Sequence, residues 1–166
     1  MSVTVRVATI ADAPLIVSFI RELAEYERLL HEVEATEADI RRDLFGENPR
    51  SFCEIAEADG EPVGFALWFY NFSTFRGQAG IYLEDLFVRP VARGAGAGKA
   101  LLRKLAQRCV DAELGRLEWT VLNWNTPSIE FYDSLGADAM TDRTVRRLDG
   151  EALERLAASC APRRRP

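Results

Sequence analysis

The sequence predicts a single α/β domain, and three observations support this fold class. At 166 residues with 48% hydrophobic content, the chain is long enough for one core and too short for two ordinary domains. The pair Asp59-Gly60 between two strand-like segments is a strong hairpin signal. A glycine-rich loop between an apolar strand and an amphipathic helix indicates a β-loop-α unit. We expect the domain to occupy residues 1–160 and to be followed by a disordered tail, residues 161–166.

The chain begins with a strand and then a helix. Residues 3–8 alternate between apolar and polar at period two, which predicts a strand. Asp12 and Pro14 suit the start of the helix that follows. Apolar residues recur on one face of this helix: Ile16, Phe19, Ile20 and Leu23.

A short helix and a hairpin come next. Thr36 and Asp39 have the spacing of a capping box, and we expect Gly46 to end the helix in a left-handed conformation. Strands at residues 51–58 and 63–71 flank the hairpin turn and should be antiparallel.

The second half of the chain alternates strands and helices after a loop at residues 73–80. The expected elements are a strand at Ile81–Val88, a helix ending near Glu113, a strand at Leu117–Leu122, a helix at Thr126–Leu135 ended by Gly136, a strand at Thr144–Leu148 and a helix from about Gly150.

Composition excludes several classes of function. A net charge of −5 and a pI near 5.1 disfavour nucleic-acid binding. The chain has no apolar run long enough to cross a bilayer and no secretory leader, so we expect a cytoplasmic protein without a membrane partner. Three scattered cysteines (Cys53, Cys109 and Cys160) indicate neither disulfides nor zinc, and His31 has no second ligand nearby. We therefore expect no metal.

The glycine-rich loop, residues 93–99, is suited to bind a phosphate through backbone N–H groups at a helix start. A Walker loop would need glycine in place of Arg93 and a hydroxyl in place of Ala100. The dinucleotide pattern would need a third glycine at Lys99. The pattern that fits is R-x-x-G-x-G, formed by Arg93, Gly96 and Gly98.

This loop and the strand before it, Tyr82–Val88, resemble the acetyl-CoA loop of the GNAT acetyltransferase superfamily. A second motif of that family follows at the expected distance: Trp124-Asn125-x-Pro127-Ser128-Ile129-x-Phe131-Tyr132-x-x-x-Gly136-Ala137. The resemblance implies the GNAT fold, with a mixed, mostly antiparallel sheet of about six or seven strands flanked by helices. It also implies acetyl-CoA as co-substrate, held where two parallel strands splay apart.

Within the superfamily the chain resembles the diamine (spermidine/spermine) N-acetyltransferases, from about Val5 to Gly136. Further shared segments are Glu22–Glu27, Thr36–Asp39, Phe45–Pro49, Tyr82–Asp85 and Trp124–Ile129. The glycine loop departs from the pattern, because Ala92, Ala95 and Ala97 replace bulkier residues; backbone binding of phosphate should survive this change. The resemblance implies transfer of an acetyl group to a primary amine of a diamine, polyamine or lysine analogue, directly in a ternary complex, by a homodimer.

Acetyl transfer to a protonated amine requires a base, and Glu84 and Asp85 are the candidates because they interrupt a strongly apolar strand. Both are also candidate substrate-binding residues. Neighbouring strand residues face opposite sides, so one of them could instead pair with a surface arginine. The resemblance favours Glu84 as the base.

The resemblance assigns Tyr132 as the acid that protonates the coenzyme A thiolate and Asn125 as a contact of the pantetheine arm. Asn125, Ile129 and Tyr132 share one helix face. A half-buried structural aromatic remains the alternative for Tyr132. A backbone N–H of residues 86–88 should stabilise the oxyanion if this strand carries a bulge or splays from its neighbour. The expected cofactor-binding residues are Leu86, Phe87, Val88, Arg93, Gly94, Ala95, Gly96, Ala97, Gly98, Lys99, Asn125, Ser128 and Tyr132.

An acidic segment should attract the substrate. Seven carboxylates fall between Glu22 and Asp39, and Tyr26 and Glu27 are the first candidates for substrate binding; a solvated acidic loop is the alternative. Two other functions remain open: acetylation of a protein lysine or N-terminus, and a non-catalytic acetyl-CoA sensor.

Overall fold

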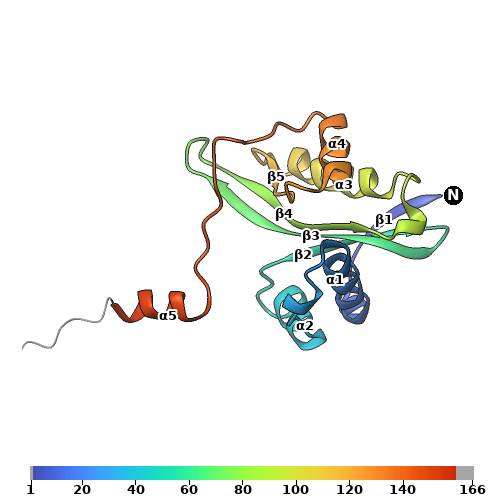
Figure 1. Ribbon diagram of the computed structural model, residues 1–166. Helices are drawn as coiled ribbons and strands as arrows, with labels where there is room; N and C mark the ends of the chain where they lie inside the picture. The colour runs from blue at the N-terminus through green and yellow to red at the C-terminus, as the bar shows by residue number, and fades with distance from the viewer. Residues whose placement is uncertain (1, 160–166) are drawn as a thin grey trace, which may run out of the picture. The chain divides into compact units, whose positions relative to one another are not determined.

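The computed structural model describes residues 2–159 and contains a five-stranded sheet (Figure 1). The chain divides into two compact units, Met1–Thr120 and Val121–Pro166, and all five strands belong to the first. Cys160 and the predicted tail at residues 161–166 lie outside the described residues. From residue 2 to residue 159, no helix has the length and apolar character that a membrane span requires.

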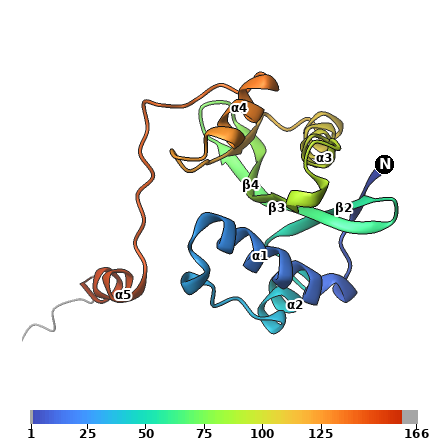
Figure 2. The same ribbon diagram turned by 45° about the vertical axis from the view of Figure 1, so that its right-hand side comes forward.

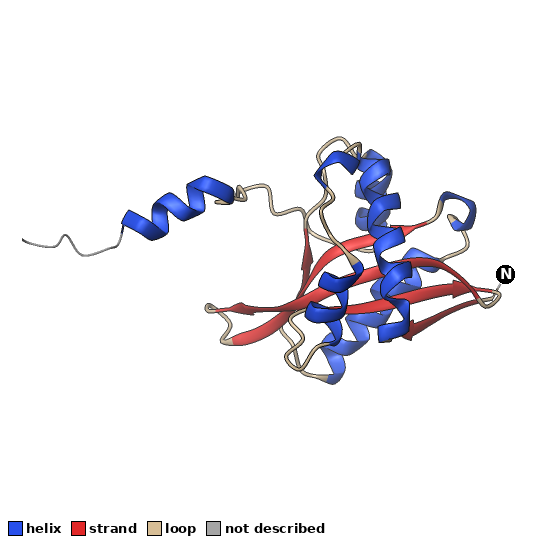
Figure 3. Cartoon of the chain, turned by 90° about the horizontal axis from the view of Figure 1, so that it is seen from below, coloured by secondary structure: helices blue, strands red, loops and turns tan. Residues whose placement is uncertain are grey.

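The sheet is mixed and mostly antiparallel, as predicted. Its strands are β1 (Val3–Val7), β2 (Phe52–Ala58), β3 (Glu61–Ser73), β4 (Gln78–Val88) and β5 (Leu117–Trp119). The strands, drawn in red in Figure 3, lie in sequence order in the sheet; β1 to β4 pair antiparallel, and β5 pairs parallel to β4. The described residues therefore contain five strands, where the sequence had predicted six or seven.

The predicted hairpin between β2 and β3 is confirmed. Asp59 and Gly60 have φ angles of 51° and 87°, so both central residues of the turn are left-handed, as the twist of a tight hairpin favours. The next hairpin is longer than predicted, because β3 continues to Ser73 and β4 begins at Gln78. The loop expected at residues 73–80 is thereby reduced to residues 74–77.

Helices cover both faces of the sheet (Figure 2): α1 (Ala13–Glu27) and α2 (Glu37–Phe45) lie on one face and α3 (Ala97–Asp111) on the other. Phe19 of α1 stacks on Phe65 of β3, with ring centroids 5.5 Å apart. Three-residue 3₁₀ helices occur at Ile10–Asp12, Leu30–Glu32 and Pro90–Ala92. The buried face of α3 consists of Ala97, Leu101, Leu102, Leu105 and Cys109.

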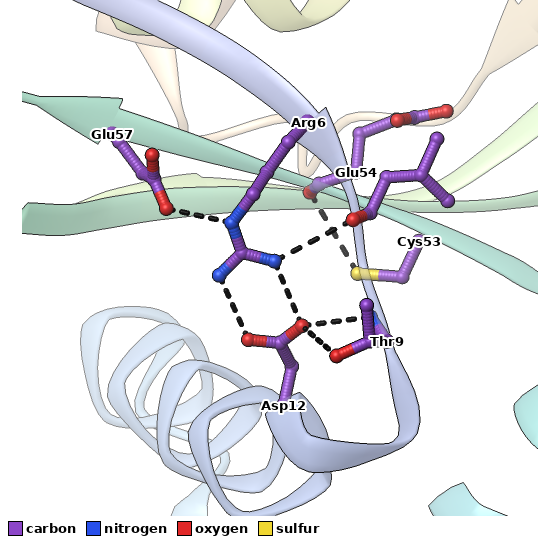
Figure 4. A network of polar contacts seen from close by, with 7 residues as sticks. Arg6, Thr9, Asp12, Cys53, Glu54 and Glu57 are labelled. Atoms are coloured by element: carbon purple, nitrogen blue, oxygen red, sulfur yellow. Dashed lines mark hydrogen bonds and ion pairs between the residues drawn. The ribbon is translucent and has the colours of Figure 1, made fainter. Parts of the chain in front are cut away.

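An ion-pair network fixes the connection from β1 to α1 (Figure 4). The Arg6 guanidinium donates two hydrogen bonds of 2.8 Å to the Asp12 carboxylate and one of 2.6 Å to Glu57. The same carboxylate accepts from the backbone N–H of Thr9 at 2.7 Å. Hydrogen bonding to Arg6 lowers the pKa of Asp12 to about 2. The predicted role of Asp12 at the start of the helix is confirmed.

The prediction for Gly46 is wrong in its conformation. The capping box of Thr36 and Asp39 is present, and α2 does end before Gly46. Gly46, however, is extended, with φ −73° and ψ −174°. Glycine is needed here for space, because a Cβ would lie 2.4 Å from the carbonyl oxygen of Arg42.

The second unit contains α4 (Thr126–Ser134) and α5 (Gly150–Ser159). Gly136 ends α4 as predicted: it is left-handed at φ 81°, and the N–H of Ala137 bonds the carbonyl oxygen of Tyr132 at 3.2 Å, which is a Schellman motif. The predicted strand at residues 144–148 does not form. The segment has no strand partner among the described residues, and both Val145 and Leu148 are exposed.

Candidate active site

A β-bulge lies at the centre of β4. Leu67 of β3 pairs with Asp85, but the next residue, Trp68, pairs with Leu83, so Glu84 is an extra residue in the ladder. The bulge decides how the two predicted carboxylates differ. Glu84 is exposed, whereas Asp85 is partly buried.

Beyond the bulge, one edge of β4 is open. The parallel pairing with β5 covers only residues 81–83 of β4 and ends at Leu83 opposite Trp119. From Glu84 onward, β4 pairs only with β3 within the described part of the chain. The resemblance to GNAT acetyltransferases predicted that these two strands splay apart. The short pairing of β4 with β5, which ends at Leu83, agrees with that prediction.

The open edge presents backbone N–H groups. The N–H of Arg89 bonds Val63 of β3 at 2.8 Å, and in an antiparallel ladder alternate residues point the other way. The N–H groups of Leu86 and Val88 therefore point away from β3, toward the open edge. Phe87 differs from both, since its side chain is 4% exposed and packs against Phe19 in the core.

The glycine loop follows directly after the open edge. Gly94 and Gly96 are left-handed, with φ 81° and 89°, and no atom lies within 4 Å of the position where a Cβ would stand. The first helical bond of α3 joins the N–H of Ala100 to the carbonyl oxygen of Gly96 at 2.9 Å. The N–H groups of residues 97–99 precede it, so the helix ladder leaves them available to an anion.

Glu27, Glu84 and Asp85 interact electrostatically, and we call them the carboxylate cluster. Burial, and then the charges of Glu84 and Glu27, raise the pKa of Asp85 to about 7. Burial also raises the pKa of Glu27, at the last position of α1. A carboxyl group with a pKa near 7 can accept a proton at neutral pH, and neighbouring anions attract a cation.

Most of the predicted acidic segment does not join this cluster. Glu22 binds Arg89 through two hydrogen bonds of 2.7 and 2.9 Å, which fasten α1 to the end of β4. Asp39 caps α2 and pairs with Arg42 at 2.8 Å. Of the seven carboxylates, Glu27 is the one whose charge acts on Asp85. The segment is not one loop, because α1 and α2 contain most of its carboxylates, but Glu25, Glu32, Glu34 and Glu37 are exposed, as solvated carboxylates would be.

Tyr26, the other predicted substrate residue, lies under an arginine. The guanidinium of Arg93 is 4.7 Å from the centre of the Tyr26 ring. The Nε of Arg93 also donates to the carbonyl oxygen of Val88 at 3.1 Å. The sequence motif gave no signal for this contact, because the two residues are far apart in the chain.

The second predicted motif lies in the second unit. Asn125 is the N-cap of α4 and is 6% exposed; its side-chain oxygen accepts from the N–H of Ser128 at 3.4 Å. Ile129 and Tyr132 are half-buried, and the Tyr132 ring centroid is 5.4 Å from that of Phe131. The motif thus holds α4 together locally. Across residues 2–159, no three His, Cys, Asp or Glu side chains form a group suited to a metal ion.

The bulged and splayed β4, the glycine loop and the motif of α4 together define an acetyltransferase of the GNAT class. The chain belongs to this family, since the sequence model of the acetyltransferase (GNAT) family matches residues 16–137.

The chain is similar to the thialysine N-ε-acetyltransferase of Bos taurus, with 39% identity over 166 residues, covering 93% of this chain and 97% of the relative. It is 36% identical over 140 residues to human spermidine/spermine N(1)-acetyltransferase-like protein 1, covering 80% of this chain and 20% of that protein. These similarities confirm the predicted resemblance to the diamine branch. An integron cassette protein from V. cholerae has a similar structure, with a TM-score of 0.79, 28% identity, and coverage of 95% of this chain and 98% of that one.

Proposed function

We propose that this GNAT acetyltransferase moves an acetyl group from acetyl-CoA to a primary amine of a small cationic substrate, such as a diamine, polyamine or lysine analogue. The observation that carries the proposal is the carboxylate cluster beside the open edge of β4. It combines a group able to accept a proton at neutral pH with two anions that attract an ammonium group. The relatives support the same substrate class, because their names specify thialysine and polyamines.

The residues present fit acetyl-CoA. An open strand edge suits a pantetheine arm, which carries amides that pair with backbone groups, and the amides of residues 97–99 suit a diphosphate. Acetyl-CoA would supply the activated acyl group. Leu86 and Val88 would bind it through backbone N–H groups, and the glycine loop, residues 93–99, would bind its phosphates. Ser128 and Asn125 of the second motif remain predicted contacts.

In the proposed mechanism, Asp85 is the base. It takes a proton from the substrate ammonium, directly or through one water, which leaves a neutral nitrogen able to attack. Glu84 and Glu27 hold the substrate by its positive charges. A backbone N–H of the open edge stabilises the oxyanion, and Tyr132 protonates the departing thiolate. The base differs from the sequence prediction, which had favoured Glu84.

We further propose a cytoplasmic homodimer. Exposed apolar residues in the second unit support self-association, notably Leu153 and Leu156 on α5, each 53% exposed. Sedimentation velocity tests the dimer: a single species near twice the monomer mass of 18.6 kDa is expected, and a monomer at micromolar concentration would contradict it.

A panel of amines tests the function. The enzyme is incubated with acetyl-CoA and, in turn, spermidine, spermine, ornithine, lysine, thialysine and a lysine-containing peptide, and thiol release is followed. Turnover of small cationic amines above the peptide is expected. A preference for the peptide would favour a protein acetyltransferase. Calorimetric binding of acetyl-CoA without turnover of any amine would favour the sensor.

A further inference from the structure

We propose that Arg93 is a positioning residue that couples the coenzyme A loop to the amine-binding end of α1 by holding Tyr26. This inference rests on the proposed function and extends it to the order and strength of binding. Arg93 is the first residue of the R-x-x-G-x-G motif and one of the residues that the sequence predicted to bind the cofactor.

The side chain of Arg93 bridges three elements of the first unit. Its backbone opens the glycine loop, its Nε donates to the carbonyl oxygen of Val88 at the end of β4, and its guanidinium covers the ring of Tyr26 on α1. A planar guanidinium can hydrogen bond at its edge while it stacks through its face, which lysine cannot do. The loop is therefore connected to α1 through one side chain.

A second arginine, Arg89, also connects α1 to the end of β4. Arg89 binds the Glu22 carboxylate through two nitrogens and lies over the ring of Phe19, with its guanidinium carbon 4.7 Å from the ring centre. The C-terminal half of α1 is thus attached to the end of β4 at Phe19 and Glu22 through Arg89, and at Tyr26 through Arg93. A displacement of the glycine loop would reach Glu27, and through it the carboxylate cluster.

The consequence is a reciprocal coupling of the two ligands. Coenzyme A orders the loop and with it Arg93, so Tyr26 and Glu27 are already positioned when the amine binds. By thermodynamic linkage, the bound amine must increase the affinity for coenzyme A by the same factor. A partly exposed cation–π contact supports a coupling of about two- to fivefold.

Calorimetry of the full-length protein measures the coupling without turnover. Coenzyme A, which carries no acetyl group, is titrated with and without a saturating concentration of the amine that the panel turns over best. The wild type should bind coenzyme A about two- to fivefold more tightly with the amine. The ratio of the coenzyme A affinities with and without amine should fall to near one in Arg93→Met and in Tyr26→Leu. The double variant should reduce this ratio no further.

Two further variants serve as controls. Tyr26→Phe keeps the ring and should keep the ratio, and it remains informative if Arg93→Met does not fold. Arg21→Met removes an exposed cation from the same helix and should leave the ratio unchanged. In steady-state kinetics, Arg93→Met should raise the KM for the amine and lower kcat less. The fold increase in KM should exceed the fold decrease in kcat by about two- to fivefold.

The outcomes separate this inference from the proposed function. If the wild type turns over no amine, the proposed function fails. If the wild type is active but shows a ratio of one, or if Arg93→Met weakens coenzyme A equally with and without amine, Arg93 only binds phosphate and the coupling is overturned. An unchanged ratio in Tyr26→Leu overturns it as well.

Discussion

Replacing Glu84 by glutamine distinguishes the two candidate bases, because each assignment predicts a different pH profile. The pKa of Asp85 is raised to about 7 by burial and by the charges of Glu84 and Glu27. If Asp85 is the base, Glu84→Gln removes one of these charges and the pKa of Asp85 falls. The acidic limb of kcat/KM, which reports the free enzyme, then moves to lower pH.

The size of the shift follows from electrostatics. A like charge acting across a partly solvated distance contributes about 1 kcal/mol. At 1.36 kcal/mol for each pKa unit, the acidic limb should move down by about 0.7 pH unit. If Glu84 were the base, the same substitution would instead remove the limb and most of the activity.

Asp85→Asn is the companion experiment. It should lower kcat/KM at pH 7 by about 10²- to 10⁴-fold, because the general base is lost. It should also stabilise the fold above pH 7. The folded-state pKa of Asp85 lies above its unfolded value, so the stability linked to this proton is complete below pH 4 and is lost as pH rises through 7. Asparagine avoids this loss, which is at most about 4 kcal/mol.

Thiol release measured from pH 5.5 to 9.5 gives the profile, and thermal unfolding at pH 4.5 and 8.5 gives the stability. Glu61→Gln, an exposed carboxylate at the start of β3, is the matched control and should change neither. A pH-dependent rate that persists in Asp85→Asn, together with a flat or absent profile in Glu84→Gln, would refute the assignment of Asp85.

Three further predictions concern other parts of the chain. Tyr132→Phe should lower kcat with little change in acetyl-CoA affinity, because the phenol acts late; equal activity would remove it from the mechanism. Gly46→Ala should lower the free energy of unfolding by about 1–3 kcal/mol, since the added Cβ meets the Arg42 carbonyl oxygen at 2.4 Å, and unchanged urea unfolding would contradict this. Arg108→Met should cost about 3 kcal/mol, because Glu54, 1% exposed and 2.6 Å from that guanidinium, keeps a buried charge. Burial raises the pKa of Glu54, so the cost should be smaller at pH 5 than at pH 8 when melting is compared.

The elements predicted correctly are those whose signals are local. The turn at Asp59-Gly60 and the capping box at Thr36 act within four residues, so the chain segment itself determines them. The strand predicted at residues 144–148 does not form for the opposite reason: a strand needs a partner edge, and the residues of the segment do not show whether one is present. Gly46 is a third case. The sequence correctly predicted that glycine is needed after this helix, but the reason is the lack of space for a Cβ and not a left-handed conformation.

In the candidate site, the sequence proposed the residues, and only the family resemblance ranked Glu84 above Asp85 as the base. Glu84 and Asp85 are adjacent acids in one strand, and alternation predicts only that they face opposite sides. What separates them is the bulge opposite Leu67 and Trp68 and the burial of Asp85, both set by contacts between β3, β4 and α1. The contact of Arg93 with Tyr26 depends on tertiary packing, so the motif alone predicted Arg93 only as a cofactor-binding residue.

The open edge of β4 follows from its bulge, which explains why the proposed base and the proposed oxyanion donors lie on the same strand. An extra residue in β4 increases the local twist of the strand, so the ladder with β5 ends at Leu83. The N–H groups of Leu86 and Val88 then lack strand partners and are available to a ligand. Glu84, the extra residue, is exposed, whereas Asp85 is partly buried and its burial raises its pKa. A regular strand could have continued the ladder with β5 and paired these N–H groups, so one local irregularity supplies the oxyanion donors that the proposed mechanism requires.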